Sequence, residues 1–154
     1  MAPSPEAEAC LKTAIQNIEG LLHALDGLTQ DDLDRPLLPT ANSLVALATH
    51  TIGAAEFHVL QSLCGQSVPR DRAQEFRAAG TPVAALRERW AEARARMQRA
   101  VAALPPEELG RERDLPYLGT VTGLEVLLAT VRHSAEHHGQ AGLKIGRASC
   151  RERV

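Results

Sequence analysis

The apolar residues of this chain recur at intervals of three and four positions, and this spacing constrains the fold more than any other feature. Such spacing lines up one face of an α-helix, whereas a half-buried strand needs strict alternation. The spacing occurs in residues 5–25, 43–64, 81–104 and 122–143, and no segment alternates convincingly. We therefore predict an all-α fold, a four-helix bundle, in a single domain of residues 1–143.

The amino-acid composition agrees with packed helices. Hydrophobic residues make up 44% of the 154 residues, but the aromatic side chains are only Phe57, Phe76, Trp90 and Tyr117. The core must therefore be built from Leu, Val, Ile and Ala, which suits helix packing better than a β-sandwich.

Two of the connections between the expected helices are long. Residues 66–80 and 105–121 are polar and contain proline and glycine. In the connection between the first two helices, residues 29–33 could form one short helical turn. Connections of this length are unusual in a simple up-down bundle. We expect them to carry a crossover or to cover one end of the core.

Residues 144–154 depart from the pattern of the preceding chain. The stretch "KIGRASCRERV" has no apolar period, carries four basic residues, and resembles a sequencing-library adapter translated in frame. We predict that it is a non-native tail and that the last helix ends near Leu143. A basic interaction tail is the alternative.

Charge and cysteine usage exclude several classes of protein. A formal net charge of −2 predicts no attraction to nucleic acid or to an anionic membrane, and no apolar run is long enough to span a bilayer. The N-terminus lacks the pattern of a signal peptide. The three scattered cysteines are typical of reduced thiols, so we expect a cytoplasmic protein.

Histidines concentrate in the last helical segment, "TVRHSAEHHGQ". His133 and His137 are four residues apart and therefore lie within about 40° of each other on a helix, whereas His138 lies about 140° from His133. Such an HxxxH pair can occupy two coordination positions of a metal ion without straining the backbone.

His50, in the middle of the second segment, is the candidate for a third ligand. The residues that share its helical face are mostly small, as are those beside His133, which leaves room for an ion near the bundle axis. Three neutral imidazoles with open positions form the catalytic type of site for zinc, nickel, iron or manganese. The alternative is that the histidines are incidental, since a single histidine on an apolar face is more often a satisfied core residue.

Other polar residues near these histidines have weaker claims. Glu136 and Gln140 flank the ligand face and could orient an imidazole or reach a bound water. We expect His58 and His23 to be structural, and Glu56, about 120° from His50 around the helix, to be solvated.

Two motifs resemble those of a known family. The stretch "SLVALATHTIGAAEFHVLQSLCG" is similar to the second helix of the DinB-like metal-binding four-helix bundles, and "RHSAEHHGQ" resembles their last-helix signature, HxxxH followed by Gly-Gln. The resemblance covers residues 5 to 143. The family often has "HHRGQ" here, so Glu136 and His138 depart from its commonest form.

The resemblance implies a fold, a ligand set and a class of activity. It implies an up-up-down-down bundle that is commonly a homodimer, with His50, His133 and His137 as the metal triad. Characterised members include divalent-metal enzymes that use low-molecular-weight thiols such as bacillithiol or mycothiol. The leading hypothesis is therefore a thiol S-transferase that joins a small-molecule thiol, of the bacillithiol, mycothiol or glutathione type, to an electrophilic substrate.

Two other functions fit the same ligands. A hydrolase would use a metal-bound hydroxide, and a metal-binding protein of stress-response type would show no turnover. The sequence shows no Ser-His-Asp or reactive-cysteine pattern, and Cys64 at a helix end is poorly placed to form a thiolate.

Overall fold

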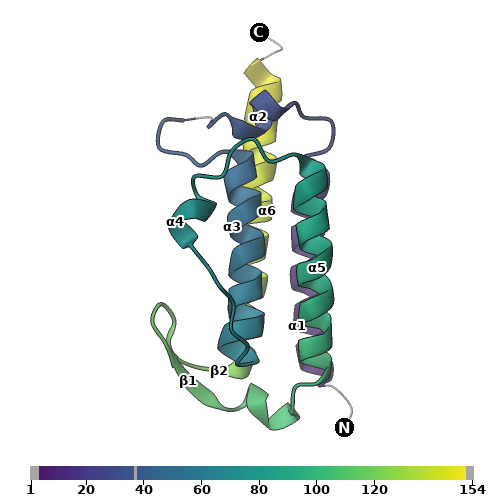
Figure 1. Cartoon of the computed structure of the whole chain (residues 1–154), viewed down its shortest axis with the longest axis vertical. Helices are drawn as coiled ribbons and strands as arrows, with labels where there is room; N and C mark the ends of the chain where they lie inside the picture. Colours follow the sequence, from purple (N-terminus) through teal and green to yellow (C-terminus); the bar gives the residue numbers. More distant parts are fainter. Residues whose placement is uncertain (1–3, 37, 152–154) are drawn as a thin grey trace.

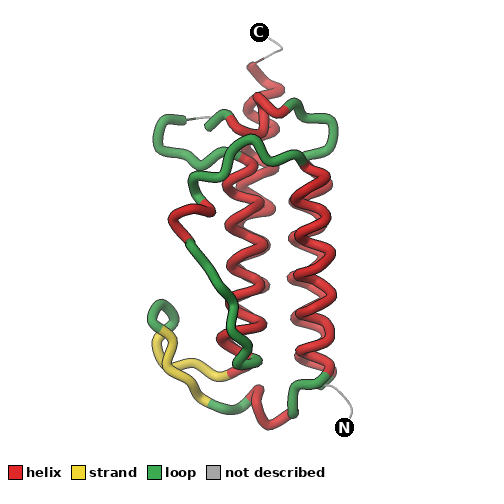
Figure 2. Tube along the Cα trace, in the orientation of Figure 1, coloured by secondary structure: helices red, strands yellow, loops and turns green. Residues whose placement is uncertain are grey.

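Four long helices form an elongated bundle in the computed structural model, which describes residues 4–36 and 38–151, with side chains up to residue 146 (Figures 1 and 2). They are α1 (Pro5–Ala24), α3 (Leu44–Glu56), which continues as the π-helical η1 (Phe57–Leu63), α5 (Val83–Ala102) and α6 (Gly123–Arg151). The predicted all-α four-helix bundle is confirmed.

Capping side chains set the starts of the long helices. Ser4 Oγ accepts a hydrogen bond from the Ala7 N–H, and Ser43 Oγ accepts one from the Ala46 N–H. At the start of α6, the Thr122 N–H donates to Glu125 Oε2 at 2.7 Å. Each cap satisfies a backbone or side-chain donor at a helix end that would otherwise lack a partner.

The direction of the helices explains the long connections. In Figure 1, α1 and α6 run upward, while α3 and α5 run downward. In chain order the directions are therefore up, down, down and up, which differs from the up-up-down-down order that the family resemblance implied. The parallel pairs are α1 with α6 and α3 with α5. Residues 64–82 form the expected crossover, which returns the chain along the bundle from the lower end of η1 to the start of α5 and contains α4 (Arg72–Glu75).

The core lies along the axis of the bundle and is aliphatic, as the composition requires. Its fully buried side chains include Ile18 and Leu22 of α1, Leu47 and Ile52 of α3, Leu86 and Met97 of α5, and Leu127 of α6. The packing of α1 against α6 is the most extensive of any pair of elements. Gly20 contributes to it, because a Cβ there would collide with the His138 ring.

The connections contain more regular structure than the sequence predicted. The short turn expected near residue 30 is α2 (Gln30–Asp34). The last connection holds η2 (Pro106–Leu109) and an antiparallel hairpin of β1 (Glu112–Leu115) and β2 (Gly119–Thr122), which the sequence analysis missed. Four-residue strands packed on one side only are too short to show a clear alternation.

Helix α6 continues through Arg151, past the end predicted at Leu143. Ile145 is half-buried against the core, and Lys144 Nζ donates a hydrogen bond to the Asn42 carbonyl. The non-native origin of residues 144–154 stays a prediction, and residues 152–154 lie outside the described part of the chain. Within that part, no helix has the length and apolar composition needed to cross a membrane.

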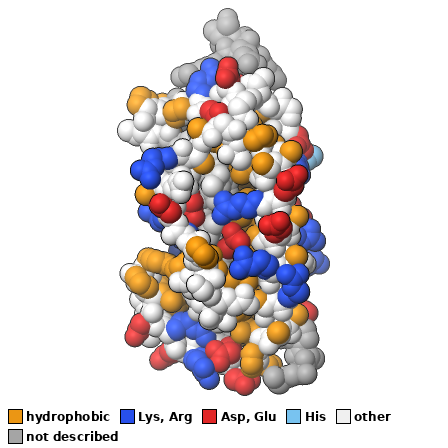
Figure 3. Space-filling view, in the orientation of Figure 1, with side chains coloured by type: hydrophobic (Ala, Val, Ile, Leu, Met, Phe, Trp, Pro, Cys, Tyr) orange, Lys and Arg blue, Asp and Glu red, His pale blue; other side chains and the backbone are white. Residues whose placement is uncertain are grey.

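Arginines on the outer face of α5 pair with acidic residues from neighbouring helices. Arg89 and Arg96 both approach Glu56, at 3.3 and 3.4 Å. Glu56 is therefore only 12% exposed, and the expectation that it is solvated was wrong. Basic and acidic side chains are interspersed over the face that includes α4 and α5, so no large area of one sign forms there (Figure 3).

Candidate metal centre

Three imidazoles from two helices converge inside the bundle. His50 projects from α3 and is 4% exposed, while His133 and His137 project from α6 and are half-buried. His133 Nε2 lies 3.1 Å from His50 Nε2 and 3.0 Å from His137 Nε2. One nitrogen from each ring lies within 4.8 Å of the other two, which makes the group a candidate metal site. The structure thus brings together all three residues singled out in the sequence.

Acceptors on the outer side of two rings select their tautomers. His50 Nδ1 lies 3.0 Å from Glu75 Oε2, and His137 Nδ1 lies 2.9 Å from Gln140 Oε1. Because these oxygens can only accept, each Nδ1 must carry a proton and donate it. Both Nε2 atoms of the neutral rings therefore present a lone pair to His133.

This arrangement leaves one short contact unsatisfied by hydrogen bonding. His133 Nε2 faces two acceptors, His50 Nε2 and His137 Nε2, and can donate a proton to only one of them. A cation at the centre would satisfy all three lone pairs. Metal–nitrogen bonds of about 2.0–2.1 Å place ligand nitrogens about 2.9 Å apart at right angles and about 3.3 Å apart in a tetrahedron. The observed separations of 3.0 and 3.1 Å fit that range.

Burial keeps the His50 and His133 rings in the neutral form that a metal requires. Desolvation lowers the pKa of His133 to about 3, with further lowering by the neighbouring His137 and His50. Desolvation also lowers the pKa of His50, although its hydrogen bond to Glu75 opposes the shift. Neutral imidazole is the metal-binding form, so at neutral pH no proton has to be removed before binding.

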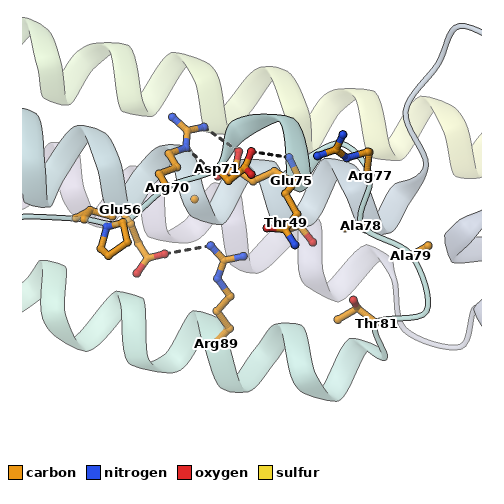
Figure 4. A pocket seen from close by; sticks show the side chains of 14 residues that line it. Thr49, Glu56, Arg70, Asp71, Glu75, Arg77, Ala78, Ala79, Thr81 and Arg89 are labelled. Carbon is orange, nitrogen blue, oxygen red and sulfur yellow. Dashed lines mark hydrogen bonds and ion pairs between the residues drawn. The ribbon is translucent and has the colours of Figure 1, made fainter.

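The carboxylate behind His50 comes from the crossover. Glu75 of α4 is 7% exposed and accepts two hydrogen bonds from Arg70, at 2.8 and 2.9 Å (Figure 4). Burial acts to raise the pKa of Glu75, but the hydrogen bonds from Arg70 and His50 outweigh it and lower the pKa. Gly53 makes the approach of α4 to α3 possible, because a Cβ there would overlap the Glu75 carboxylate.

A cavity of about 440 Å³ adjoins two of the three imidazoles. His50 and His133 form part of its wall, and His58 of η1 and Tyr117 of the hairpin turn also line it. His58 is 8% exposed, its ring centroid lies 5.9 Å from that of His133, and burial lowers its pKa to about 4. A small molecule in this cavity would lie against the imidazole cluster.

Among the other polar residues that the sequence suggested, one contacts a ligand histidine and the rest do not. Gln140 contacts His137, as expected of a residue that orients an imidazole. Glu136 is exposed, and its carboxylate lies 3.8 Å from Arg132 instead of beside an imidazole. His23 is at the surface and pairs with Asp26, and His138 packs against α1.

Sequence reasoning missed Glu75 and Arg70 and assigned His58 a purely structural role. Glu75 and Arg70 lie in a connection whose path depends on tertiary packing. The signal that the sequence offered was a glutamate in a long connection that follows the helix with His50. His58 is about 80° from His50 around an α-helix. At that angle His58 does not share the face of the metal ligands, but its ring still lines the adjacent cavity.

Fold and site together define an all-α bundle protein with a three-histidine candidate metal centre. The chain belongs to the DinB superfamily, whose family model matches residues 14–141. The chain is also similar to the crystal structure of a conserved protein from Enterococcus faecalis, with a TM-score of 0.71 and 14% identity over 90% of this chain and 94% of that one. At this identity the likeness shows the fold alone. No curated protein is significantly similar in sequence.

The buried His58 predicts acid sensitivity of the metal-free protein. Its pKa is about 4 in the folded chain and about 6.5 when unfolded, so between these values only the unfolded chain binds the proton. Stability is therefore full above pH 6.5 and falls by on the order of 3 kcal/mol as the pH drops to about 4. His58→Phe should lose less stability than wild type between pH 7.5 and 4.5 in urea unfolding. Equal losses in the two chains would contradict the assignment.

Proposed function

We propose that this protein binds a divalent transition metal through His50, His133 and His137 and uses it to transfer a low-molecular-weight thiol to an electrophile. The observation that supports a metal is that His133 Nε2 lies 3.1 Å from His50 Nε2 and 3.0 Å from His137 Nε2, while the outer Nδ1 atoms of His50 and His137 are held by acceptors. Zinc, nickel, iron and manganese all accept imidazole ligands, so the donor set favours this group of metals over calcium or magnesium.

The outer residues would hold the site ready for the ion. Arg70 fixes the Glu75 carboxylate, which fixes His50, while Gln140 fixes His137. Such partners orient the ring and strengthen the imidazole as a donor. Protein ligands from only three residues would leave further coordination positions for a substrate, as in catalytic rather than structural sites.

The thiol supplies the nucleophile in this proposal. A divalent metal at the site would lower the pKa of a coordinated thiol and so provide a thiolate at neutral pH. The transfer forms a bond from sulfur to the electrophilic carbon, the leaving group departs with the bonding electron pair, and the thiol proton goes to solvent. The adjacent cavity, with His58 and Tyr117 in its wall, would hold the reactants beside the imidazoles.

The cysteines of the protein itself do not compete for this role. Burial raises the pKa of the Cys64 thiol to about 11, and burial also raises the pKa of Cys10. Thiolate is the reactive form, so neither side chain is activated at neutral pH. An external thiol therefore fits the site better than a nucleophile from the described part of the chain.

Loss of the imidazoles should abolish metal binding. We expect wild-type protein, incubated with zinc and desalted, to carry about one ion per chain, and the triple variant His50→Ala/His133→Ala/His137→Ala to carry almost none. The control is His23→Ala, which removes a surface histidine. Elemental analysis measures both, with circular dichroism to verify folding. Stoichiometric metal in a folded triple variant would refute the assigned ligands.

Glu75 should matter for metal affinity, and Glu136 should not. Removing an outer partner of a ligand typically weakens metal binding 10–100-fold, so we expect a loss of about that size for Glu75→Ala and partial rescue by Glu75→Gln. Glu136→Ala is the matched control because its carboxylate reaches no imidazole. Competition with a chelator gives the dissociation constants. Equal affinities for Glu75→Ala and Glu136→Ala would rule out the positioning role.

Turnover should require a thiol. We expect metal-loaded protein to consume an aromatic halide electrophile only when bacillithiol, mycothiol or glutathione is present, and the triple histidine variant to show the background rate. Consumption of substrate without any thiol would favour a metal-hydroxide hydrolase. Tight metal binding with no turnover under any condition would favour a non-catalytic metal-binding protein.

A further inference from the structure

The cavity beside the imidazole cluster is lined by cationic and neutral side chains. Its wall includes Arg70, Arg72 and Arg132, together with histidines and small or apolar residues, and none of the residues that line it is acidic. The whole chain has a formal net charge of −2. The charge of this wall is thus opposite in sign to that of the molecule.

Two of these three arginines have no strong carboxylate partner, so their charge is available to a ligand. Arg70 is neutralised by Glu75 in a close bidentate pair. Arg72 lies over the Phe76 ring, 4.9 Å from its centroid, and has no carboxylate partner in the described chain. Arg132 is 70% exposed and lies 3.8 Å from Glu136, a contact too long and too exposed to be strong.

His58 also lacks a partner. The ring is 8% exposed and lines the cavity, yet it makes no hydrogen bond to any residue that the structure describes, and its Nδ1 is buried. A buried polar group without a partner lowers the stability of the folded chain. Such a cost is usually explained by a ligand, a water or a function.

We propose that this cavity binds the carboxylate-bearing arm of the thiol, with Arg72 and Arg132 attracting its negative charge and the His58 ring as a hydrogen-bond partner. The inference rests on the proposed function and narrows its substrate to anionic thiols, such as glutathione or bacillithiol, over uncharged ones such as mycothiol. A cavity of about 440 Å³ lies within the range of roughly 300–1,000 Å³ that holds small-molecule ligands. A thiol bound in this cavity would have its carboxylate arm near Arg72 and Arg132 and its sulfur toward the imidazoles.

Calorimetry on the zinc-loaded protein tests the charge preference. The probes are S-methylglutathione and its diethyl ester, which share their skeleton and differ in two carboxylates. The methylated sulfur cannot form a thiolate, so binding reports on the cavity and not on the transfer chemistry. We expect the free acid to bind at least tenfold more tightly than the ester, with a preference that shrinks at high salt.

Three variants assign the preference to residues. Arg72→Gln/Arg132→Gln should reduce the ratio of the two affinities to below about threefold and leave ester binding unchanged, because the two guanidinium charges attract the carboxylates and not the ester. Arg99→Gln, an exposed arginine of α5 outside the cavity, should leave the ratio unchanged. His58→Phe should weaken binding of the free acid while keeping or raising the thermal stability at pH 7.5, since it removes a buried unpaired group.

Equal affinities for acid and ester, tighter binding of the ester, or no binding of either would overturn the inference. Failure of the proposed function would give a different combination of binding and turnover results. If the acid is preferred and the preference depends on Arg72 and Arg132, but glutathione supports no turnover, the cavity assignment stands and the transferase assignment fails. If an uncharged thiol such as 2-mercaptoethanol supports turnover and the ester binds as tightly as the acid, the transferase assignment stands and the charge selection fails.

Discussion

The hydrogen bond between His50 and Glu75 is the contact on which the candidate site depends. It fixes the orientation and tautomer of the imidazole that α3 contributes, and it is itself held by Arg70. The contact exists because the crossover brings α4 against α3 at Gly53, where any larger residue would overlap the carboxylate. A connection that is long for a simple bundle thereby supplies the buried charge that supports the site.

The two sides of the imidazole cluster differ in charge. Behind His50, the carboxylate of Glu75 and the guanidinium of Arg70 balance each other in a nearly dry environment. On the cavity side, Arg72 and Arg132 have no strong carboxylate partner and His58 lacks a hydrogen bond. A buried, compensated pair stabilises a fixed geometry, whereas uncompensated cations beside a cavity favour an anionic ligand.

Much of the fold followed from local patterns. The three- and four-residue spacing predicted all four long helices, and in the structure Ser43 and Thr122 lie at two of their starts. The hairpin was missed because its strands are short, and α6 extends past Leu143 although that segment lacks an apolar stripe. Among the site residues, His50, His133 and His137 were predictable because helical geometry converts spacing into direction. Gln140 followed from the same geometry, but Glu136 points away from the imidazoles.

The sequence by itself determined the helices, the family motifs and which imidazoles share a face. Only the tertiary structure decided how far apart the two helices stand at His50 and His133, and therefore that the nitrogens meet at 3.1 Å. It also decided that Glu75, held by Arg70, contacts His50, and that Arg72 of the same irregular connection lines the cavity beside it. The physical reason is that helical periodicity is encoded within a few residues, whereas the path of a crossover depends on packing against residues far away in the chain.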